Sequence, residues 1–215
     1  MNIVCTADGS KTLYSDRFAE HYHNVSGAES ESNYVFIDAG YMEASAIPVA
    51  VLEIGFGTGL NAWLTLQQAT RMQRHTLYET LERYPVDDAT AQALSDDELF
   101  RRLHSAPWEQ SVEINRYFTL FKNKSDILKI KAFARSYDVV YFDAFSPRVQ
   151  PEMWNRDIFE LLYAAMNPGG VLTTYCAKGD VRRTLQNIGF SVERLPGAVG
   201  KREMLRARIM CHSPL

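Results

Sequence analysis

Three glycines at alternate positions, Gly55, Gly57 and Gly59, form the first stretch of this sequence that could do chemistry. They directly follow a run of apolar and β-branched residues at 49–54. Because glycine has no Cβ, a loop of this kind lets the backbone come close to a bound ligand. Apolar side chains then recur at helical spacing over 60–67, and the first N–H groups of a helix have no partner within it. The stretch predicts a strand, a ligand-binding loop and a helix, with a glycine loop that binds nothing as the alternative.

Two acidic residues end later apolar runs. Glu82 closes a predicted strand at 75–82, at about the 20-residue distance from the glycines where a carboxylate binds ribose in nucleotide-binding sheets. Two hydroxyl donors can pair with its two carboxylate oxygens. Asp143 closes 137–142, a continuous apolar run typical of a strand buried on both faces. The alternatives are an exposed strand end for Glu82 and a turn cap before Pro147 for Asp143.

The spacing of the glycines decides between two kinds of nucleotide cofactor. A dinucleotide loop needs G-x-G-x-x-G, but Leu60 stands at the last of these positions and Gly59 comes one residue early. Glu53 followed by G-x-G-x-G resembles the first motif of the class I S-adenosylmethionine-dependent methyltransferases. The resemblance implies that the loop wraps the amino-acid end of S-adenosylmethionine. The cofactor-binding residues expected on this basis are Glu53, Gly55, Phe56, Gly57, Thr58, Gly59, Asn61, Glu82, Asp126 and Asp143.

Asp126 and Asp143 have different expected roles. Ser125 and Asp126 follow a predicted strand at 118–121, and either side chain could contact the adenine amino group. Both also favour a helix start, and capping is the preferred interpretation. In an open parallel sheet, ligands bind beyond the carboxyl ends of the strands at the reversal of strand order. The strands before Gly55 and Asp143 should therefore be neighbours, with Asp143 beside the sulfonium. There it can accept a hydrogen bond from a substrate amine and orient the nitrogen lone pair.

Composition describes an ordinary globular chain. Of its 215 residues, 46% are apolar and 23% are charged, and no run approaches the length of a membrane span. The first 20 residues lack the profile of a signal peptide, so a cytoplasmic protein is expected. Cys5, Cys176 and Cys211 are isolated, which suggests neither a zinc site nor a disulfide framework. His21 and His23 lie two residues apart and would face opposite ways on a strand, so no metal is expected.

The distribution of charge is uneven although the net charge is only −3. Such a balance does not by itself indicate a nucleic-acid binder. Acidic residues collect between Asp87 and Glu98. Basic residues form two clusters, which are Lys201, Arg202, Arg206 and Arg208 in the tail, and Lys122, Lys124, Lys129 and Lys131. Each basic cluster can also be interpreted as solvated surface.

The alternation of apolar runs predicts an α/β protein. We expect a Rossmann-like class I methyltransferase domain at 49–215, with a seven-stranded, mostly parallel sheet and helices on both faces. Pro85 to Leu103 should be helical, and Glu203 to Met210 should form the last strand, antiparallel to its neighbours. Residues 1–48 should form an N-terminal extension of short strands and a helix. Within it we expect the helix near Ser15 to Tyr22 and a strand at Tyr34 to Asp38.

Longer motifs narrow the resemblance. The sequence reads DAFSP at 143–147, PEMW at 151–154, PGGVL at 168–172, TYCAKG at 174–179 and GKREMLR at 200–206, after DGS at 8–10 and Tyr22-His23. In this order they resemble the methyltransferase domain of the MnmC-type tRNA-modifying enzymes, over nearly the whole chain. Ser125-Asp126 departs from the Gly-Asp expected there. The family also carries a flavin-dependent oxidase, for which this chain has no room, so a stand-alone methyltransferase is expected.

This resemblance implies methyl transfer from S-adenosylmethionine to the exocyclic amine of 5-aminomethyl(-2-thio)uridine at the wobble position of tRNA. Asp143 is the expected catalytic residue. The substrate-binding residues expected are Phe145, Pro147, Trp154, Lys178, Lys201 and Arg202. Phe145 and Trp154 would stack on a flipped base or wall the sulfonium, unless they are core residues. Lys178, Lys201, Arg202 and Arg206 would meet tRNA phosphates.

Two other functions fit the sequence. One is an amine methyltransferase that acts on a small molecule, and the other is a cofactor-binding partner module without activity. The intact glycine loop with Glu53 and Asp143 argues against the inactive module, and the basic tail favours tRNA. The sequence does not specify the tRNA species, dependence on 2-thiolation, the source of the aminomethyl substrate, the proton acceptor or the oligomeric state. It is consistent with a monomer.

Overall fold

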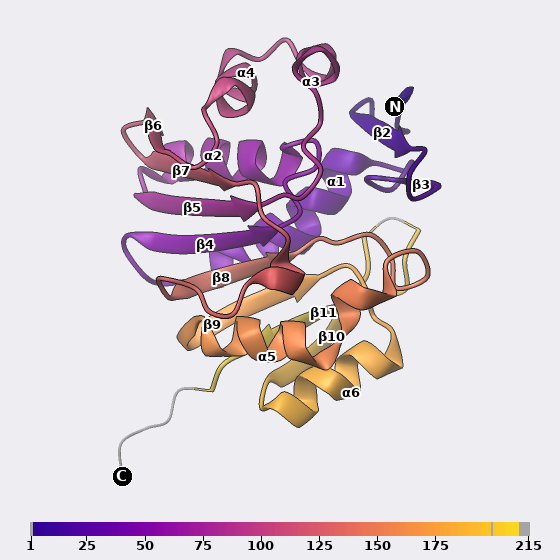
Figure 1. The fold of residues 1–215 in the computed structure, drawn as a ribbon, viewed down its shortest axis with the longest axis vertical. Helices are drawn as coiled ribbons and strands as arrows, with labels where there is room; N and C mark the ends of the chain where they lie inside the picture. Colours follow the sequence, from indigo (N-terminus) through magenta and orange to yellow (C-terminus); the bar gives the residue numbers. More distant parts are fainter. Residues whose placement is uncertain (1, 199, 211–215) are drawn as a thin grey trace.

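A computed structural model describes residues 2–198 and 200–210 of the chain (Figure 1). Its centre is an eight-stranded sheet with the order β10-β11-β9-β8-β4-β5-β7-β6. Its strands are β4 (Val49–Ile54), β5 (Thr76–Leu81), β6 (Ser111–Asn115), β7 (Phe118–Asn123), β8 (Tyr137–Phe142), β9 (Met166–Thr174), β10 (Ser191–Pro196) and β11 (Glu203–Arg208). A separate three-stranded sheet holds β1 (Asn2–Cys5), β2 (Lys11–Ser15) and β3 (Glu20–His21).

Helices connect the strands and cover the large sheet. They are α1 (Ala28–Ser32), α2 (Leu60–Met72), α3 (Asp88–Leu94), α4 (Glu98–Ser105), α5 (Arg156–Ala164) and α6 (Gly179–Ile188). Short turns of 3-10 helix lie at Tyr41–Glu43, Ile127–Lys129 and Pro151–Trp154. None of the helices in the described ranges is long and apolar enough to cross a membrane. Cys5 and Cys176 are free thiols, and Cys211 lies outside the described residues.

The order of the strands reverses at β4. The chain runs from β4 through β5 to β7 on one side and then returns to place β8 and β9 on the other. β4 pairs in parallel with both β5 and β8, which confirms that the strands before Gly55 and Asp143 are neighbours. Their carboxyl ends meet at one edge, where parallel sheets place their ligands. In Figure 1 the arrowheads of β4 and β5 point towards the side that carries β2 and β3.

Two layers of helix follow from the alternation of side chains along β4. Val49 and Val51 face a cluster with α2 and α4, whereas Leu52 and Ile54 face a cluster with α5 and α6. Figure 1 shows α5 and α6 in front of the sheet and α2 behind it. The predicted Rossmann-like α/β architecture with helices on both faces is therefore confirmed.

The strand count was wrong by one. The eighth strand is β6, which pairs antiparallel with β7 at the edge of the sheet and contains a bulge between Glu113 and Asn115. Its polar residues alternate with Val112 and Ile114, as expected of a strand with one solvated face. β11 is antiparallel to both β9 and β10 as predicted, although it ends at Arg208.

Two predictions for the N-terminal residues were wrong. Ser15 to Tyr22 is not helical, because it contains the end of β2, a turn and β3. Tyr34 to Asp38 is not a strand, since 33–38 forms a π-helical turn. Its Val35 and Phe36 are buried in the cluster that also holds Val49, so packing against the large sheet overrides their β propensity. The domain boundary at residue 48 stays a prediction.

The acidic stretch before β6 forms two helices rather than one. Ser95 is extended and separates α3 from α4. The Asp87 side chain accepts a hydrogen bond from the N–H of Thr90, and Asp97 accepts one from Phe100. Both residues therefore act as helix N-caps, which explains part of the acidic composition.

Candidate functional site

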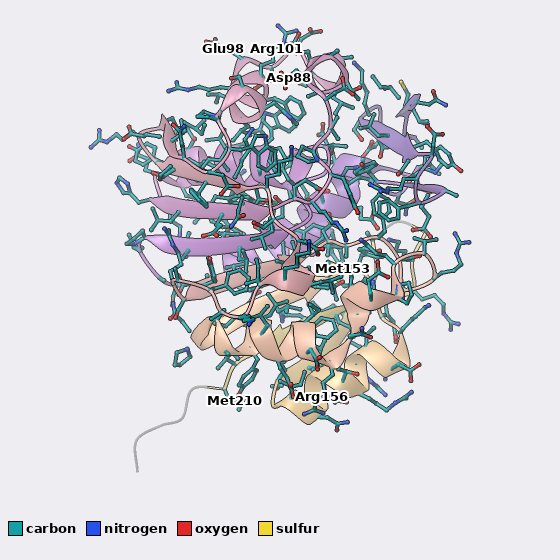
Figure 2. All side chains as sticks on the ribbon, viewed as in Figure 1. Asp88, Glu98, Arg101, Met153, Arg156 and Met210 are labelled. Atoms are coloured by element: carbon teal, nitrogen blue, oxygen red, sulfur yellow. The ribbon has the colours of Figure 1, made fainter. Side chains whose placement is uncertain are left out.

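A pocket of about 510 Å³ opens at the carboxyl ends of β4, β5 and β8, within the size range of small-molecule sites. Most of the residues predicted to bind ligand line it. These are Gly55, Phe56, Gly57, Thr58, Asn61, Glu82, Asp126, Asp143, Phe145 and Lys201. Met153, labelled in Figure 2, also lines the pocket, whereas the labelled Asp88, Glu98 and Arg101 lie on α3 and α4.

The glycine loop has the backbone that its sequence predicts. Gly55 has a φ of +95° and Gly57 one of +50°, in the left-handed region that favours glycine. A Cβ on Gly55 would lie 2.9 Å from the carbonyl oxygen of Asp143. A Cβ on Gly57 would lie 3.0 Å from the ring of Tyr22. The first glycine thus lets β4 and β8 approach each other, and the second lets the N-terminal extension close over the loop.

Gly59 does not line the pocket, in contrast to our prediction. A Cβ there would lie 2.7 Å from His104 Nε2, so this glycine makes room for α4 instead. Burial lowers the pKa of His104 to about 4. The neutral ring lies with Nε2 2.9 Å from the carbonyl oxygen of Thr58, to which it can donate. His104 therefore braces the loop from outside.

Lys122 supports His104 and is not part of a basic surface. Its side chain is 1% exposed, and Nζ donates to the carbonyl oxygen of His104 over 2.6 Å. Nζ also lies 4.8 Å from the centre of the Trp108 ring. Burial lowers the pKa of Lys122 to about 8. Its apolar neighbours and its carbonyl partner show that the sequence cluster to which we assigned it does not form one solvated face.

Glu82 reaches into the pocket from the end of β5. Its Oε2 accepts a hydrogen bond of 3.0 Å from the N–H of Gly57, and Oε1 accepts one of 2.7 Å from that of Tyr84. Burial raises the pKa of Glu82, while these N–H groups act in the opposite direction. Each carboxylate oxygen keeps a further lone pair, so the side chain can still accept from two hydroxyl groups.

The polar groups of the pocket fit S-adenosylmethionine. Thr58 and Asn61 each carry a buried side-chain oxygen that has no hydrogen-bond partner among the described residues. Buried polar atoms are normally satisfied, so these oxygens indicate a polar ligand beside the glycine loop. The loop and Asn61 would hold the amino-acid end of the cofactor, and Glu82 would hold the ribose.

Asp126 performs the capping role that we preferred. Its Oδ1 accepts a hydrogen bond of 3.1 Å from the N–H of Leu128, and its Oδ2 lies 3.0 Å from Arg83. It also lines the pocket beside Ser125. Contact between Asp126 and the adenine stays a prediction. The carboxylate that would make this contact is already held in place by Leu128 and Arg83.

Asp143 lies at the end of β8, where a reacting group was expected. Asn61 donates from Nδ2 to Oδ2 of Asp143 over 2.8 Å. Burial raises the pKa of Asp143 to about 7, although the hydrogen bond from Asn61 opposes the rise. A carboxyl group with this pKa can take or release a proton near neutral pH.

Glu53 lies beneath the pocket rather than on its wall. The residue is 0% exposed, and Thr80, Tyr78 and Asn61 are polar groups close to it. Burial raises its pKa well above the usual range, and the charge of Asp143 raises it further. Direct contact between Glu53 and the cofactor stays a prediction, while its position supports Asn61 from below.

Trp154 packs as a core residue, the alternative that the sequence left open, and it does not line the pocket. Its ring packs 5.0 Å from that of Phe142 and is 8% exposed. Nε1 donates to the carbonyl oxygen of Phe145 over 2.9 Å. Trp154 thus fixes the backbone that carries Phe145. Pro147 lies in the turn beyond and does not line the pocket.

Lys201 points into the pocket rather than outward to a phosphate. It forms an ion pair with Glu31, and its Nζ lies 4.1 Å from the centre of the Tyr175 ring. The hydroxyl of Tyr175 donates to the carbonyl oxygen of Ala144, next to Asp143. Both members of the ion pair line the pocket. They add fixed charge close to Asp143.

The rest of the basic tail is largely neutralised. Arg206 lies 2.9 Å from Glu43 and 2.8 Å from Glu193, and Arg208 pairs with the same two residues. These ion pairs argue against a contact between Arg206 and a phosphate, which stays a prediction. Lys178 and Arg202 are exposed outside the pocket, where contact with a phosphate backbone stays a prediction.

Sequence reasoning missed the contribution of residues 18–25. Phe18, Glu20, Tyr22 and His23 line the pocket from the separate small sheet. Glu20 accepts hydrogen bonds from the N–H of Ser146 over 3.2 Å and from its hydroxyl over 2.6 Å. No local pattern at 18–23 shows that these residues reach the pocket, because aromatic and polar side chains do not alternate there.

Comparison with known proteins agrees with this geometry. A family model described as S-adenosyl-L-methionine-dependent methyltransferase matches residues 97–210, more than half of the chain. A bifunctional protein named MnmC, for tRNA 5-methylaminomethyl-2-thiouridine biosynthesis, from Nitrosospira multiformis is 29% identical over 214 residues. That match covers 90% of this chain and 35% of the relative. A relative of the same name from Delftia acidovorans is 28% identical. That match covers 91% of this chain and 33% of the relative. The chain thus spans about a third of these relatives.

Solved structures show the same similarity. The crystal structure of MnmC2 from Aquifex aeolicus superposes with a TM-score of 0.81 at 25% identity, over 100% of this chain and 72% of that one. DesVI from Streptomyces venezuelae superposes with a TM-score of 0.54 at 12% identity, over 86% of this chain and 92% of that one. The second likeness shows the fold alone.

Proposed function

Because this chain belongs to the S-adenosyl-L-methionine-dependent methyltransferase family, we propose that it methylates the exocyclic amine of 5-aminomethyl(-2-thio)uridine at the tRNA wobble position. The chain is an enzyme, and S-adenosylmethionine is its cofactor. The relatives named for 5-methylaminomethyl-2-thiouridine biosynthesis support this choice of substrate. The observation that carries the proposal is Asp143, a carboxyl group with a pKa of about 7 at the wall of the cofactor pocket.

The chemistry requires an amine with a free lone pair. When bound, S-adenosylmethionine supplies a methyl group on a sulfonium that needs no activation. An aminomethyl group is largely protonated at neutral pH, and an alkylammonium has no lone pair. Asp143, oriented by Asn61, accepts the proton from this group and then holds the neutral nitrogen in line. Once Asp143 has passed this proton on to water, its carboxylate offsets the positive charge that appears on nitrogen during transfer.

Lys201 lies beside the proposed proton acceptor. Its ammonium group lines the pocket that contains Asp143 and lowers the pKa of that carboxyl, whereas the charge of Glu31 raises it. The ion pair with Glu31 keeps Lys201 in place, and the Tyr175 ring beneath it stabilises the cation further. The reacting amine therefore meets Asp143 beside an ion pair whose two charges largely offset each other.

The same proposal assigns the residues that contact the tRNA and the compartment in which the protein acts. Lys178 and Arg202 are the exposed basic residues that we assign to tRNA phosphates. The protein would act in the cytoplasm on tRNA.

The pairing of Arg206 and Arg208 with acidic residues favours a second candidate, a methyltransferase for small amines. A comparison of substrates separates the two functions. We expect kcat/KM for an anticodon stem-loop with aminomethyluridine to exceed that for the free nucleoside by at least about a hundredfold, because phosphate contacts contribute only to the RNA. The advantage should shrink as salt rises. Equal kcat/KM values at low salt would favour the small-molecule function instead.

A further inference from the structure

Two phenylalanine rings meet face to face at the wall of the pocket. The centre of the Phe18 ring lies 4.4 Å from that of Phe145, with an angle of 28° between their planes. Phe18 belongs to the turn between β2 and β3, and Phe145 follows Asp143 at the end of β8. Both side chains are half-buried and both line the pocket. One face of Phe145 is therefore covered by a side chain from the N-terminal extension.

We propose that Phe18 and Phe145 form the two walls of a slot that binds the uracil ring of the substrate. This inference rests on the proposed function. A flipped pyrimidine presents two flat faces, and aromatic side chains stack on such faces in RNA-binding proteins. Because Phe145 lies two residues after Asp143, a ring stacked on it carries its 5-substituent close to the carboxylate. The stacked phenylalanines are the closed form of the slot.

The connections of the turn show how the two walls stay matched. Glu20, two residues after Phe18, accepts hydrogen bonds from the N–H and hydroxyl of Ser146, directly after Phe145. Arg148 donates to the same carboxylate over 3.0 Å. These bonds tie the turn to the loop that carries the other wall. The Phe18 ring can thus move outward to admit a base while its backbone stays attached.

A different part of the extension faces the cofactor. Tyr22 lies against Gly57 of the glycine loop, and it meets the edge of Phe145 with ring centres 5.0 Å apart. Tyr22 therefore contacts both the glycine loop and Phe145. Phe18 packs on Phe145, two residues after Asp143, on the acceptor side. Its loss should impair binding of the base and leave binding of S-adenosylmethionine nearly unchanged.

Three variants test this assignment, assayed on tRNA that carries aminomethyluridine with saturating S-adenosylmethionine. Phe18→Leu keeps apolar bulk but loses the flat face, and it should raise KM for the tRNA by about 10- to 100-fold, in the range measured for base–aromatic stacking. Phe18→Tyr keeps the face and should stay within about threefold of the parent. Phe133→Leu is the matched control, because Phe133 is also half-buried and aromatic but lies outside the pocket. The KM for the tRNA should not change in Phe133→Leu.

Calorimetry on the same proteins separates the possible failures. The assignment requires that the dissociation constant of S-adenosylmethionine change less than about threefold in Phe18→Leu, since no cofactor contact is lost. An unchanged KM in Phe18→Leu, with an active parent enzyme, would overturn the slot and leave the proposed function intact. Weaker cofactor binding with an unchanged KM would make Phe18 a cover for the cofactor. A parent enzyme that transfers no methyl group to this tRNA would reject the proposed function itself, and the slot with it.

Discussion

Gly57→Val is expected to abolish measurable binding of S-adenosylmethionine while the protein still folds. Gly57 has a φ of +50°, a conformation that costs a side-chain-bearing residue about 1–2 kcal/mol and a β-branched residue more. The new side chain would also push against Tyr22. The loop must then shift, which breaks the hydrogen bond from Gly57 to Glu82 and moves two predicted cofactor contacts at once. We expect affinity to fall at least about a hundredfold, which corresponds to about 3 kcal/mol.

Gly9→Val provides the matched control for this variant. Gly9 also has a positive φ, of +85°, but no atom lies within 4 Å of the position of its Cβ. The backbone strain is thus comparable, while the site is outside the pocket. Thermal denaturation should show a loss of stability for both variants, larger for Gly57→Val because of its contact with Tyr22, and calorimetry should show lost binding only for Gly57→Val. If Gly57→Val bound the cofactor with the parent affinity, the glycine loop would not be the cofactor site.

Asp143→Ala should lower the rate of methyl transfer about a hundredfold at neutral pH, with affinity for S-adenosylmethionine within a few-fold of the parent. One positioned group of this kind in a site shielded from water contributes on the order of 3 kcal/mol to the barrier. The pKa of Asp143 is raised to about 7, so the carboxylate that accepts a proton becomes populated as pH rises through 7. The rate of the parent should rise over the same interval.

Asp143→Asn distinguishes proton transfer from orientation. The amide keeps an acceptor oxygen but cannot take a proton, so we expect it to be nearly as slow as Asp143→Ala at pH 7. The deficit of both variants should shrink at higher pH, where the neutral amine forms without help. Asp138→Asn is the control, because Asp138 lies on the same strand outside the pocket and accepts hydrogen bonds from the N–H of Ala50 and the side chain of Asn167. Full activity of both Asp143 variants would show that Asp143 only caps its turn.

Local patterns predicted the elements that are buried on both faces. β4 and β8 span the predicted ranges, because a continuous apolar run between a turn and a reacting residue is unambiguous. The glycine spacing and Glu82 likewise located the pocket at the ends of β4 and β5, since both depend on short segments of backbone. The sequence analysis did not predict β6, although Val112 and Ile114 alternate with polar residues, because this edge strand has only five residues and is interrupted by a bulge.

Contacts between residues far apart in the sequence determine the features of the fold and of the pocket that the sequence analysis did not predict. The bond between Glu20 and Ser146 joins residues 126 positions apart, and no local pattern shows that the N-terminal strands cover the pocket. Trp154 and Lys201 have the residue types expected at a substrate, yet packing puts the first into the core and turns the second towards Glu31. The β propensity of Val35 and Phe36 predicted a strand, but these residues are helical because they pack against the large sheet.

The central claim is that this chain methylates the aminomethyl nitrogen of the tRNA wobble uridine. Its most direct test is incubation with S-adenosylmethionine labelled in the methyl group and tRNA that bears aminomethyluridine, followed by digestion and identification of the labelled nucleoside by mass spectrometry. The account predicts that the label appears in 5-methylaminomethyl(-2-thio)uridine, and that Asp143→Ala loses most of it at pH 7. Label on any other nucleoside, or no label in the tRNA, would contradict it.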